Sequence, residues 1–281
     1  MTIRTGWRPG VLDMKYHDHR REERREERKP VEEIEGQLEG RNALTEALKS
    51  GRTIDKVFVA AGETDKGLQR LAAQAKEAGA VVVPVDRRKL DAMSTTRAHQ
   101  GIIALAAARE YFTIDDILQE ACDRGETPLI VICDELSDPH NLGAIIRSAE
   151  CAGAHGVIIP KRRSVGLTAT VAKSSAGAVE YMKVARVTNI NAAMEELKEK
   201  GVWIFGTAAE GSVPMYKADL TGPTAIVIGS EGDGMSRLVR KNCDVTVHIP
   251  MKGKITSLNA SAAASILLYE AVRQRIVAEE G

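Results

Sequence analysis

The residue types that could do chemistry gather in three loops, and each loop follows an apolar run typical of a β-strand. The first loop follows PLIVICD and leads into the helical segment NLGAIIR, which begins with Asn141 and ends with Arg147. Arg147 lies off the apolar stripe of this segment, on the face of Gly143, and its side chain leans toward the helix start. A polar or anionic group docked there would meet the guanidinium, the Asn141 amide and unpaired N–H groups. The alternative is that Arg147 pairs with Glu150 and that Asn141 only caps the helix.

The second loop, GSEGDGMS, spans residues 229–236 and follows TAIVIG. Its three glycines would let the backbone approach a ligand without interference from Cβ atoms, and they flank the carboxylate of Glu231. The spacing is not G-x-G-x-x-G, so a dinucleotide-binding Rossmann site is poorly supported. The alternative for this loop is a glycine-rich turn or helix start.

The third loop follows the strand-like run VTVHIP and reads MKGKITSLNASAAAS. We expect a helix to start near Ser257. The residues of its first turns are so small that another backbone can pack closely against them. Ser257 and Asn259 are candidate helix caps or ligands. An alanine-rich helix packed on a neighbour is the alternative, and it is compatible with a ligand role.

The elements that must position these loops are strands alternating with helical segments. The expected strands of this region are PLIVICD, GVIIP, MKVARV, VWIFG, TAIVIG and VTVHIP. Such alternation predicts a parallel sheet covered on both faces. Ligands of parallel sheets gather at the carboxyl ends of the strands, which is where the three loops begin.

The rest of the chain divides by pattern into further segments. Residues 32–108 predict a small α/β domain with helices in EGRNALTEALKSG and DKGLQRLAAQAKEAG and strands in KVFVA, AVVVPV and QGIIALAA. Residues 109–126 predict a linker with one short helix, which Thr113 and Asp116 could open with a capping box. Residues 127–281 form the second domain. Residues 1–31 include HRREERREERKP, where like charges repel at i,i+4, and we expect a disordered tail.

Overall charge does not point to a nucleic-acid partner, because the formal net charge is zero. RNA contacts would need local basic clusters near the strand ends. Candidate residues are Lys161, Arg162 and Arg163; Arg237, Arg240 and Lys241; and Lys252 and Lys254.

The four cysteines show no C-x-x-C pairing, so we expect reduced thiols and no metal site. No apolar segment approaches the roughly 18 residues that span a bilayer, and we expect neither a membrane segment nor a signal peptide. The sequence therefore predicts a cytoplasmic protein.

Taken together, the three loops resemble a known family. NLGAIIR, GSEGDG and PMKGKITSLNASAA are similar to the three ordered motifs of the SpoU branch of the SPOUT RNA methyltransferases, over roughly residues 128–277. The front segment, from EGRNALTEAL to HQGIIALAA, resembles the ribosomal-protein-like RNA-binding domain of that family. The whole is most similar to bacterial 23S rRNA (guanosine-2'-O-)-methyltransferases, and the charged tail falls outside the resemblance.

The resemblance implies an α/β fold whose C-terminal parallel-sheet domain contains a deep trefoil knot, a feature that periodicity cannot reveal. It also implies a homodimer that binds RNA, and S-adenosyl-L-methionine held bent in the knot. The residues implied in cofactor binding are Thr207, Gly229, Ile249 and Leu258. Those implied in the catalytic cluster are Asn141, Arg147, Glu231, Ser257 and Asn259.

The reaction implied is attack by a ribose 2'-hydroxyl on the sulfonium methyl group. Arg147 is the base usually assigned in this family, but a guanidinium keeps its proton in proteins. We therefore expect Arg147 to bind the adjacent phosphate and stabilise an incipient alkoxide, while the proton leaves to water or to Glu231.

Two alternatives remain open from the sequence. A methyltransferase of the same family acting on tRNA, or on adenosine, would use the same motifs. A non-catalytic RNA-binding protein would account for the front domain but would leave Arg147, Glu231 and Asn259 without a purpose.

Overall fold

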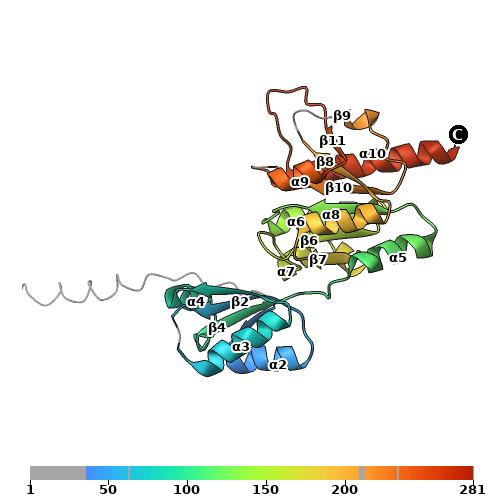
Figure 1. Ribbon diagram of the computed structural model, residues 1–281. Coiled ribbons are helices and arrows are strands. Elements are labelled where there is room, and N and C mark those ends of the chain that lie inside the picture. Colours follow the sequence, from blue (N-terminus) through green and yellow to red (C-terminus); the bar gives the residue numbers. More distant parts are fainter. Residues whose placement is uncertain (1–35, 63, 209–212, 233, 281) are drawn as a thin grey trace, which may run out of the picture. The chain divides into compact units, whose positions relative to one another are not determined.

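The computed structural model describes residues 36–62, 64–208, 213–232 and 234–280. The tail predicted for residues 1–31 lies outside these ranges. The described residues form two sheets, one of four strands and one of seven (Figure 1). In the described parts of the chain, no helix combines the length and the apolar character needed to cross a bilayer.

The smaller sheet has the strand order β1-β4-β2-β3. Its strands are β1 (Gln37–Glu39), β2 (Ile54–Ala60), β3 (Val81–Val85) and β4 (Ile102–Ala106). β2 pairs in parallel with β3, and β4 runs antiparallel to β1 and β2. The small α/β architecture predicted for this region is therefore present, with its short edge strand β1 added.

Three helices cover the smaller sheet: α2 (Arg41–Lys49), α3 (Lys66–Glu77) and α4 (Arg87–Met93). Leu44 of α2 and Leu68 of α3 are fully buried in a cluster with alternate residues of β2 and β4. Leu90 of α4 packs with Ile103 in a second, smaller cluster. Because side chains alternate along a strand, the two clusters lie on opposite faces of the sheet.

The larger sheet has the strand order β7-β6-β5-β10-β8-β11-β9, and every pair in it is parallel. Its strands are β5 (Leu129–Cys133), β6 (Gly156–Pro160), β7 (Val184–Val187), β8 (Trp203–Thr207), β9 (Val213–Pro214), β10 (Thr224–Ile228) and β11 (Val245–His248). The prediction of a parallel sheet is confirmed. The two-residue strand β9 and the 3-10 turns η1 (Ala178–Glu180) and η2 (Met215–Lys217) lacked a sequence signal.

Helices cover both faces of the larger sheet, as predicted. The helices of this region are α5 (Ile114–Arg124), α6 (Pro139–Cys151), α7 (Ala169–Ser174), α8 (Ile190–Glu199), α9 (Arg237–Asn242) and α10 (Ala260–Glu280). Val131 of β5 belongs to the core cluster with α6, α7 and α10, whereas its neighbour Ile132 belongs to the cluster with α5, α8 and α9. Strand β5 is buried at all five positions, which explains its unbroken apolar sequence.

The capping box predicted for α5 is confirmed. Thr113 Oγ1 accepts from Asp116 N, and the Asp116 carboxylate accepts from Thr113 N over 2.8 Å. Gly125 ends the helix in the left-handed conformation, with φ of 66°. Just before this helix, Phe112 pairs with Ala185 as an isolated parallel bridge, so the predicted linker contacts β7 at this residue.

A buried ion pair joins β2 to β7 within the compact unit that contains both sheets. Arg186 Nη1 lies 2.6 Å from Asp55 Oδ1, and both side chains are less than a tenth exposed. The Tyr111 hydroxyl donates to the same Asp55 oxygen over 2.8 Å and accepts from Leu167 N. This network links residues on both sides of the segment that connects the sheets.

The last strand and the last helix lie on opposite sides of β8. β11 pairs with β8 on the side away from β10, yet α10 packs against β10 and α6. The chain between β11 and α10 therefore returns past β8, and this is the segment that carries the third motif (Figure 1). The resemblance implies that the C-terminal segment threads a loop to form the knot.

Two helix starts differ from the prediction. α6 begins at Pro139, because Asp138 is its N-cap and accepts from His140 N, so that Asn141 lies inside the first turn. α10 begins at Ala260 rather than near Ser257, because Asn259 Oδ1 accepts from the backbone N–H of Ser261 and Ala262. The Asp-Pro pair was the signal for the first of these starts, since proline favours the first helical position.

Candidate active site

The three motif loops converge on a hydrogen-bonded cluster of Asn141, Glu231 and Asn259. Asn259 Nδ2 donates to Asn141 Oδ1 over 2.8 Å, and Asn141 Nδ2 donates to Glu231 Oε1 over 3.1 Å. Asn259 Nδ2 also donates to Glu231 Oε1. The three residues come from three separate connections, after β5, β10 and β11, so the sheet brings together what the sequence keeps apart.

Asn259 has two functions in this cluster, one for each end of its amide. Its Oδ1 caps α10 by accepting from the backbone N–H groups of Ser261 and Ala262. Because the oxygen is used in this way, Nδ2 must face Asn141 and Glu231. The cap and the cluster therefore depend on the same rotamer of one side chain.

The Glu231 carboxylate is asymmetrically bonded. Its Oε1 accepts from the amides of Asn141 and Asn259 and, at 3.4 Å, from Ala260 N. No described residue donates to its Oε2, and the side chain lines a cavity. One carboxylate oxygen is thus fixed by the protein, and the other is available to a bound molecule.

The loop that carries Glu231 is closed on itself. Ser230 and Gly234 exchange two backbone hydrogen bonds of 3.0 Å each. A Cβ at Gly229 would overlap the backbone of Gly234 and Met235, so glycine is required there by the loop itself. Gly234 also has a φ of +67°, a conformation that favours glycine. The conformation of this loop itself therefore requires Gly229 and favours glycine at 234, although the loop was predicted to have glycines because it receives a ligand.

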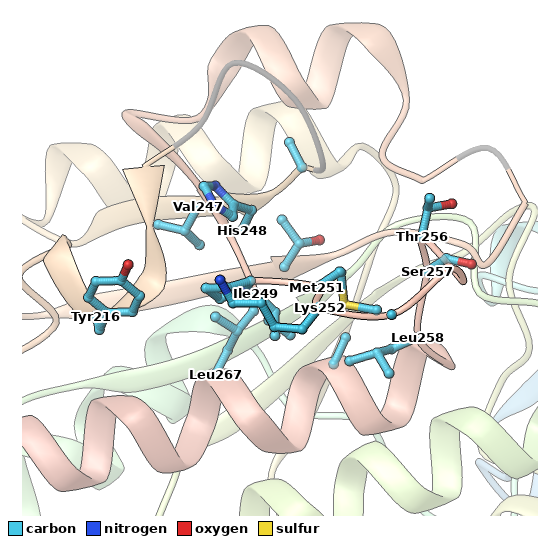
Figure 2. Close-up of a pocket in the computed structure, with 15 residues that line it drawn as sticks. Tyr216, Val247, His248, Ile249, Met251, Lys252, Thr256, Ser257, Leu258 and Leu267 are labelled. Atoms are coloured by element: carbon cyan, nitrogen blue, oxygen red, sulfur yellow. The ribbon is translucent and has the colours of Figure 1, made fainter.

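Two adjoining cavities lie beside the cluster. The larger, of about 750 Å³, is lined by residues 247–253, by Thr256 to Leu258 and by Leu267 of α10. In Figure 2, Thr256 and Ser257 lie at one end of this cavity and Tyr216 at the other, with Met251 and Leu258 between them. The smaller cavity, of about 390 Å³, is lined mainly by residues 229–232, 234 and 235. The two share Thr207, Ser257 and Leu258 among their lining residues.

The residues predicted for cofactor binding all line these cavities. Thr207 and Leu258 line both, Ile249 lines the larger and Gly229 the smaller. Of the predicted catalytic residues, Ser257 lines both cavities and Glu231 lines the smaller.

Several lining residues were not predicted from the sequence, among them one histidine, one methionine and one tyrosine. His248, Met251 and Tyr216 contribute to the larger cavity. His248 ends β11, so the rule that ligands gather at the carboxyl ends of parallel strands could have identified it. Tyr216 lies in η2, for which no sequence pattern was recognised.

Arg147 is placed differently from the rest of the predicted cluster. It lies on α6 with its side chain exposed, and it is not among the residues that line either cavity. Gly143, one turn earlier, faces α7: a Cβ there would overlap the Ser174 hydroxyl and lie 2.9 Å from Ser175 N. This glycine therefore makes room for a neighbouring helix.

Comparison with known proteins identifies the family. Residues 128–269 match the model of the SpoU rRNA Methylase family, and residues 37–112 match the model described as RNA 2'-O ribose methyltransferase substrate binding. The chain belongs to the SpoU family of RNA methyltransferases. The family predicted from the three motifs is thereby confirmed.

Relatives cover most of the chain. YacO of Bacillus subtilis (strain 168), which is named for the TrmH family of tRNA/rRNA methyltransferases, is 49% identical over 236 residues, or 84% of this chain and 94% of the relative. The 23S rRNA (guanosine-2'-O-)-methyltransferase RlmB of Ralstonia nicotianae is 43% identical over 241 residues, or 85% of this chain and 96% of the relative.

Solved structures of the family share the fold. The SpoU methyltransferase AviRb from Streptomyces viridochromogenes, in complex with AdoMet, matches with a TM-score of 0.56 and 28% identity over 86% of this chain and 90% of that chain. An AdoMet-bound rRNA methyltransferase from Sinorhizobium meliloti matches with a TM-score of 0.54 and 25% identity over 84% of this chain and 86% of that chain. The predicted SPOUT fold class is confirmed, and both neighbours hold the methyl donor that the motifs predicted.

Proposed function

We propose that this SpoU-family chain methylates a ribose 2'-hydroxyl of a guanosine in 23S ribosomal RNA, with S-adenosyl-L-methionine as the donor. The observation that carries the proposal is the convergence of Asn141, Glu231 and Asn259 beside an open cavity. The likeness to the Ralstonia RlmB supports the guanosine target, since that relative is named for it. With ribosomal RNA as its substrate, the enzyme would work in the cytoplasm.

The cavities fit a molecule of the size and chemistry of S-adenosyl-L-methionine. Small-molecule sites commonly enclose about 300–1,000 Å³, a range that contains the larger cavity. Its walls combine apolar side chains, such as Leu267, with the hydroxyls of Thr256 and Ser257. Gly253 and Gly232 add backbone with open space beside it, where a ligand could approach closely. Thr207, Gly229, Ile249 and Leu258 would hold the donor.

The protein has to orient the ribose hydroxyl and help to remove its proton. S-adenosyl-L-methionine supplies an electrophilic methyl group on its sulfonium centre. Glu231 Oε2 is the group on this chain suited to accept the 2'-hydroxyl proton, because the other carboxylate oxygen is held by Asn141 and Asn259. Those two amides fix the direction in which the carboxylate presents its unbonded oxygen. Ser257, which lines both cavities, is placed to bind the ribose or the donor.

Arg147 would act on the substrate rather than inside the cofactor cavity. Its exposed guanidinium suits the phosphate next to the target ribose. In that position it would orient the nucleotide and stabilise negative charge that develops on the 2'-oxygen.

The RNA surface would be formed by the exposed cations around the strand ends. Arg162 and Arg163 follow β6, Arg237 and Lys241 lie on α9, and Lys252 and Lys254 flank the third motif; all six are exposed. Arg163 pairs with Glu135 across the two loops that follow β5 and β6, over 3.0 Å. Both residues have positive φ, near 57°, which is uncommon for non-glycine residues. The pair links the basic loop after β6 to the loop after β5, which leads into the first motif.

A homodimer is part of the proposal. Large apolar side chains remain exposed along α10, among them Ile266, Tyr269 and Val277. The same helix packs on α6, the helix that carries Arg147. A second subunit placed there would cover this apolar surface and bring another RNA-binding surface next to the site.

Methyl transfer to defined RNAs tests the function. The purified chain is incubated with S-adenosyl-L-methionine labelled in its methyl group and with 23S rRNA or tRNA transcripts, and the modified nucleotide is mapped by mass spectrometry. We expect label on the ribose of a guanosine in 23S rRNA. Label in tRNA, or on an adenosine, would favour the alternative target. RNA binding without any transfer would instead favour a non-catalytic role.

A further inference from the structure

Asp134 is a buried carboxylate directly after β5, and neither the motifs nor the cavities account for it. It is only 4% exposed, and its backbone N–H donates to Ile228 O over 2.8 Å, which continues the pairing of β5 with β10. Its Oδ2 accepts from the backbone N–H of Ser236 over 2.7 Å. A carboxyl side chain thus directly follows a strand whose residues are all apolar.

Ser236 is the last residue of the loop that carries Glu231. Besides the bonds to Glu231, three contacts fix this loop: the close approach of Gly229 to Gly234, the burial of Met235 in the core, and the bond that Ser236 N donates to Asp134. The first is internal to the loop and the second is nonpolar. The third is a directional polar bond to the residue that follows β5 and leads toward the first motif.

The same strand end determines the position of Asn141. From Asp134 the chain turns into Asp138, which caps α6, and the first turn of that helix contains Asn141. Asp134 thus contacts the loop that carries Glu231 and also precedes the helix whose first turn carries Asn141; the bond between Asn141 and Glu231 is 3.1 Å long. A carboxylate is a suitable acceptor for the bond from Ser236 N, because charge-assisted hydrogen bonds are shorter and about twice as strong as neutral ones.

We propose that Asp134 is a positioning residue for methyl transfer: through Ser236 it holds the Glu231 loop at the position where Glu231 bonds to Asn141. Asp134 lines neither described cavity, so it would act through Glu231 and not by touching the substrate or donor. The proposal rests on the proposed function, because it assigns Glu231 to the reaction.

The variants are Asp134→Ala and Asp134→Asn, with Asp244→Ala as the matched control. Asp244 makes the same kind of bond, from its Oδ2 to the backbone N–H of Ile204 over 2.8 Å, but at the amino ends of β8 and β11. We expect Asp134→Ala to lower kcat by about 10- to 100-fold and to change the Kd for S-adenosyl-L-methionine by less than about threefold. Asp134→Asn keeps an oxygen acceptor without the charge, and its kcat should lie between those of wild type and Asp134→Ala. Asp244→Ala should leave kcat unchanged.

A double-mutant cycle with Glu231→Gln shows whether the effect passes through Glu231. If it does, Asp134→Ala causes little further loss of single-turnover rate in the Glu231→Gln background, because coupled residues are non-additive. The proposal is overturned by equal losses in both backgrounds, or by an unchanged kcat in Asp134→Ala. If Asp134→Ala does not fold, Asp134→Asn decides alone, and a wild-type kcat in that variant overturns the proposal.

Hydrogen exchange provides a readout that does not need activity. Amides of residues 230–236 should exchange faster in Asp134→Asn than in wild type, and at the wild-type rate in Asp244→Ala. Unchanged protection in Asp134→Asn would refute the anchoring role. A wild-type protein that transfers no methyl group to any RNA would instead refute the proposed function, so the two failures are distinguishable.

Discussion

Asn259 Nδ2 lies 2.8 Å from Asn141 Oδ1, although 118 residues separate the two along the chain. The contact joins the cap of the last helix to the first turn of α6, and Glu231 bonds to both side chains. The third motif, a helix cap and the carboxylate that we propose for the reaction therefore share one set of hydrogen bonds. A change at one of these positions should affect the others in a predictable way.

Replacing Asn259 should separate its two functions. Asn259→Ser keeps a side-chain oxygen to cap α10 but removes the amide donor, whereas Asn259→Ala removes both. We expect both variants to lose methyl transfer and only Asn259→Ala to lose about 1 kcal/mol of unfolding free energy. Single-turnover assays and chemical denaturation measure the two effects. Wild-type transfer by Asn259→Ser would contradict the role of the amide in orienting Glu231.

Removing the guanidinium of Arg147 should abolish activity without loss of stability. In Arg147→Ala we expect methyl transfer to fall by at least about 100-fold, because a charge-assisted contact to the substrate phosphate is lost. Binding of S-adenosyl-L-methionine, measured by calorimetry, should stay nearly intact, since Arg147 does not line the cavities. Loss of cofactor affinity in parallel with the rate would refute this assignment. Arg147→Lys is the matched control, which keeps the charge but not the two-pronged geometry.

Adding one methyl group at Gly143 should destabilise the fold. The Cβ of Gly143→Ala would overlap the Ser174 hydroxyl and press on the backbone of α7, so α6 and α7 would have to move apart. We expect a loss of about 1–3 kcal/mol in unfolding free energy. Glu150→Ala, at an exposed position of the same helix, should change it by less than about 0.5 kcal/mol. Equal stability of Gly143→Ala and wild type would show that the two helices are less tightly packed than described.

The stability of the protein should fall in mild acid because of His155. Burial is the main cause that lowers the pKa of His155 below its usual 6.5, against the opposing effect of Glu126. Its Nδ1 accepts from Leu129 N over 3.0 Å, which requires the neutral ring. The unfolded chain therefore binds a proton at this residue more readily than the native chain, and unfolding free energy decreases as pH falls below 6.5.

The size of that effect is bounded by one proton. The slope contributed by His155 is at most about 1.4 kcal/mol per pH unit. Urea denaturation between pH 7.5 and about 5 measures it in wild type and in His155→Gln, which keeps an acceptor for Leu129 N but does not titrate in this range. The slope should be smaller in the variant. Identical slopes would show that other groups cause the acid sensitivity.

Several features of this protein could be predicted from local sequence alone. The capping box of α5 follows from Thr113 and Asp116, since both partners lie within one turn. The unbroken apolar residues of β5 and β10 indicated strands buried on both faces, and the alternation with helices indicated a parallel sheet. The three motifs identified the family, because their residue types and order are specific. Each of these inferences depends on neighbours in the chain or on the order of motifs.

Only the tertiary structure decided which residues meet. β10 lies between β5 and β8, and this strand order places the loop of Glu231 next to that of Asn141. Gly143 must be glycine because of α7, which begins 26 residues later in the chain, beyond the reach of any helical periodicity. The bond between Asp134 and Ser236 spans 102 residues for the same reason. Local sequence sets backbone preferences and apolar faces, whereas contacts across a sheet arise from strand order and packing, which no short segment contains.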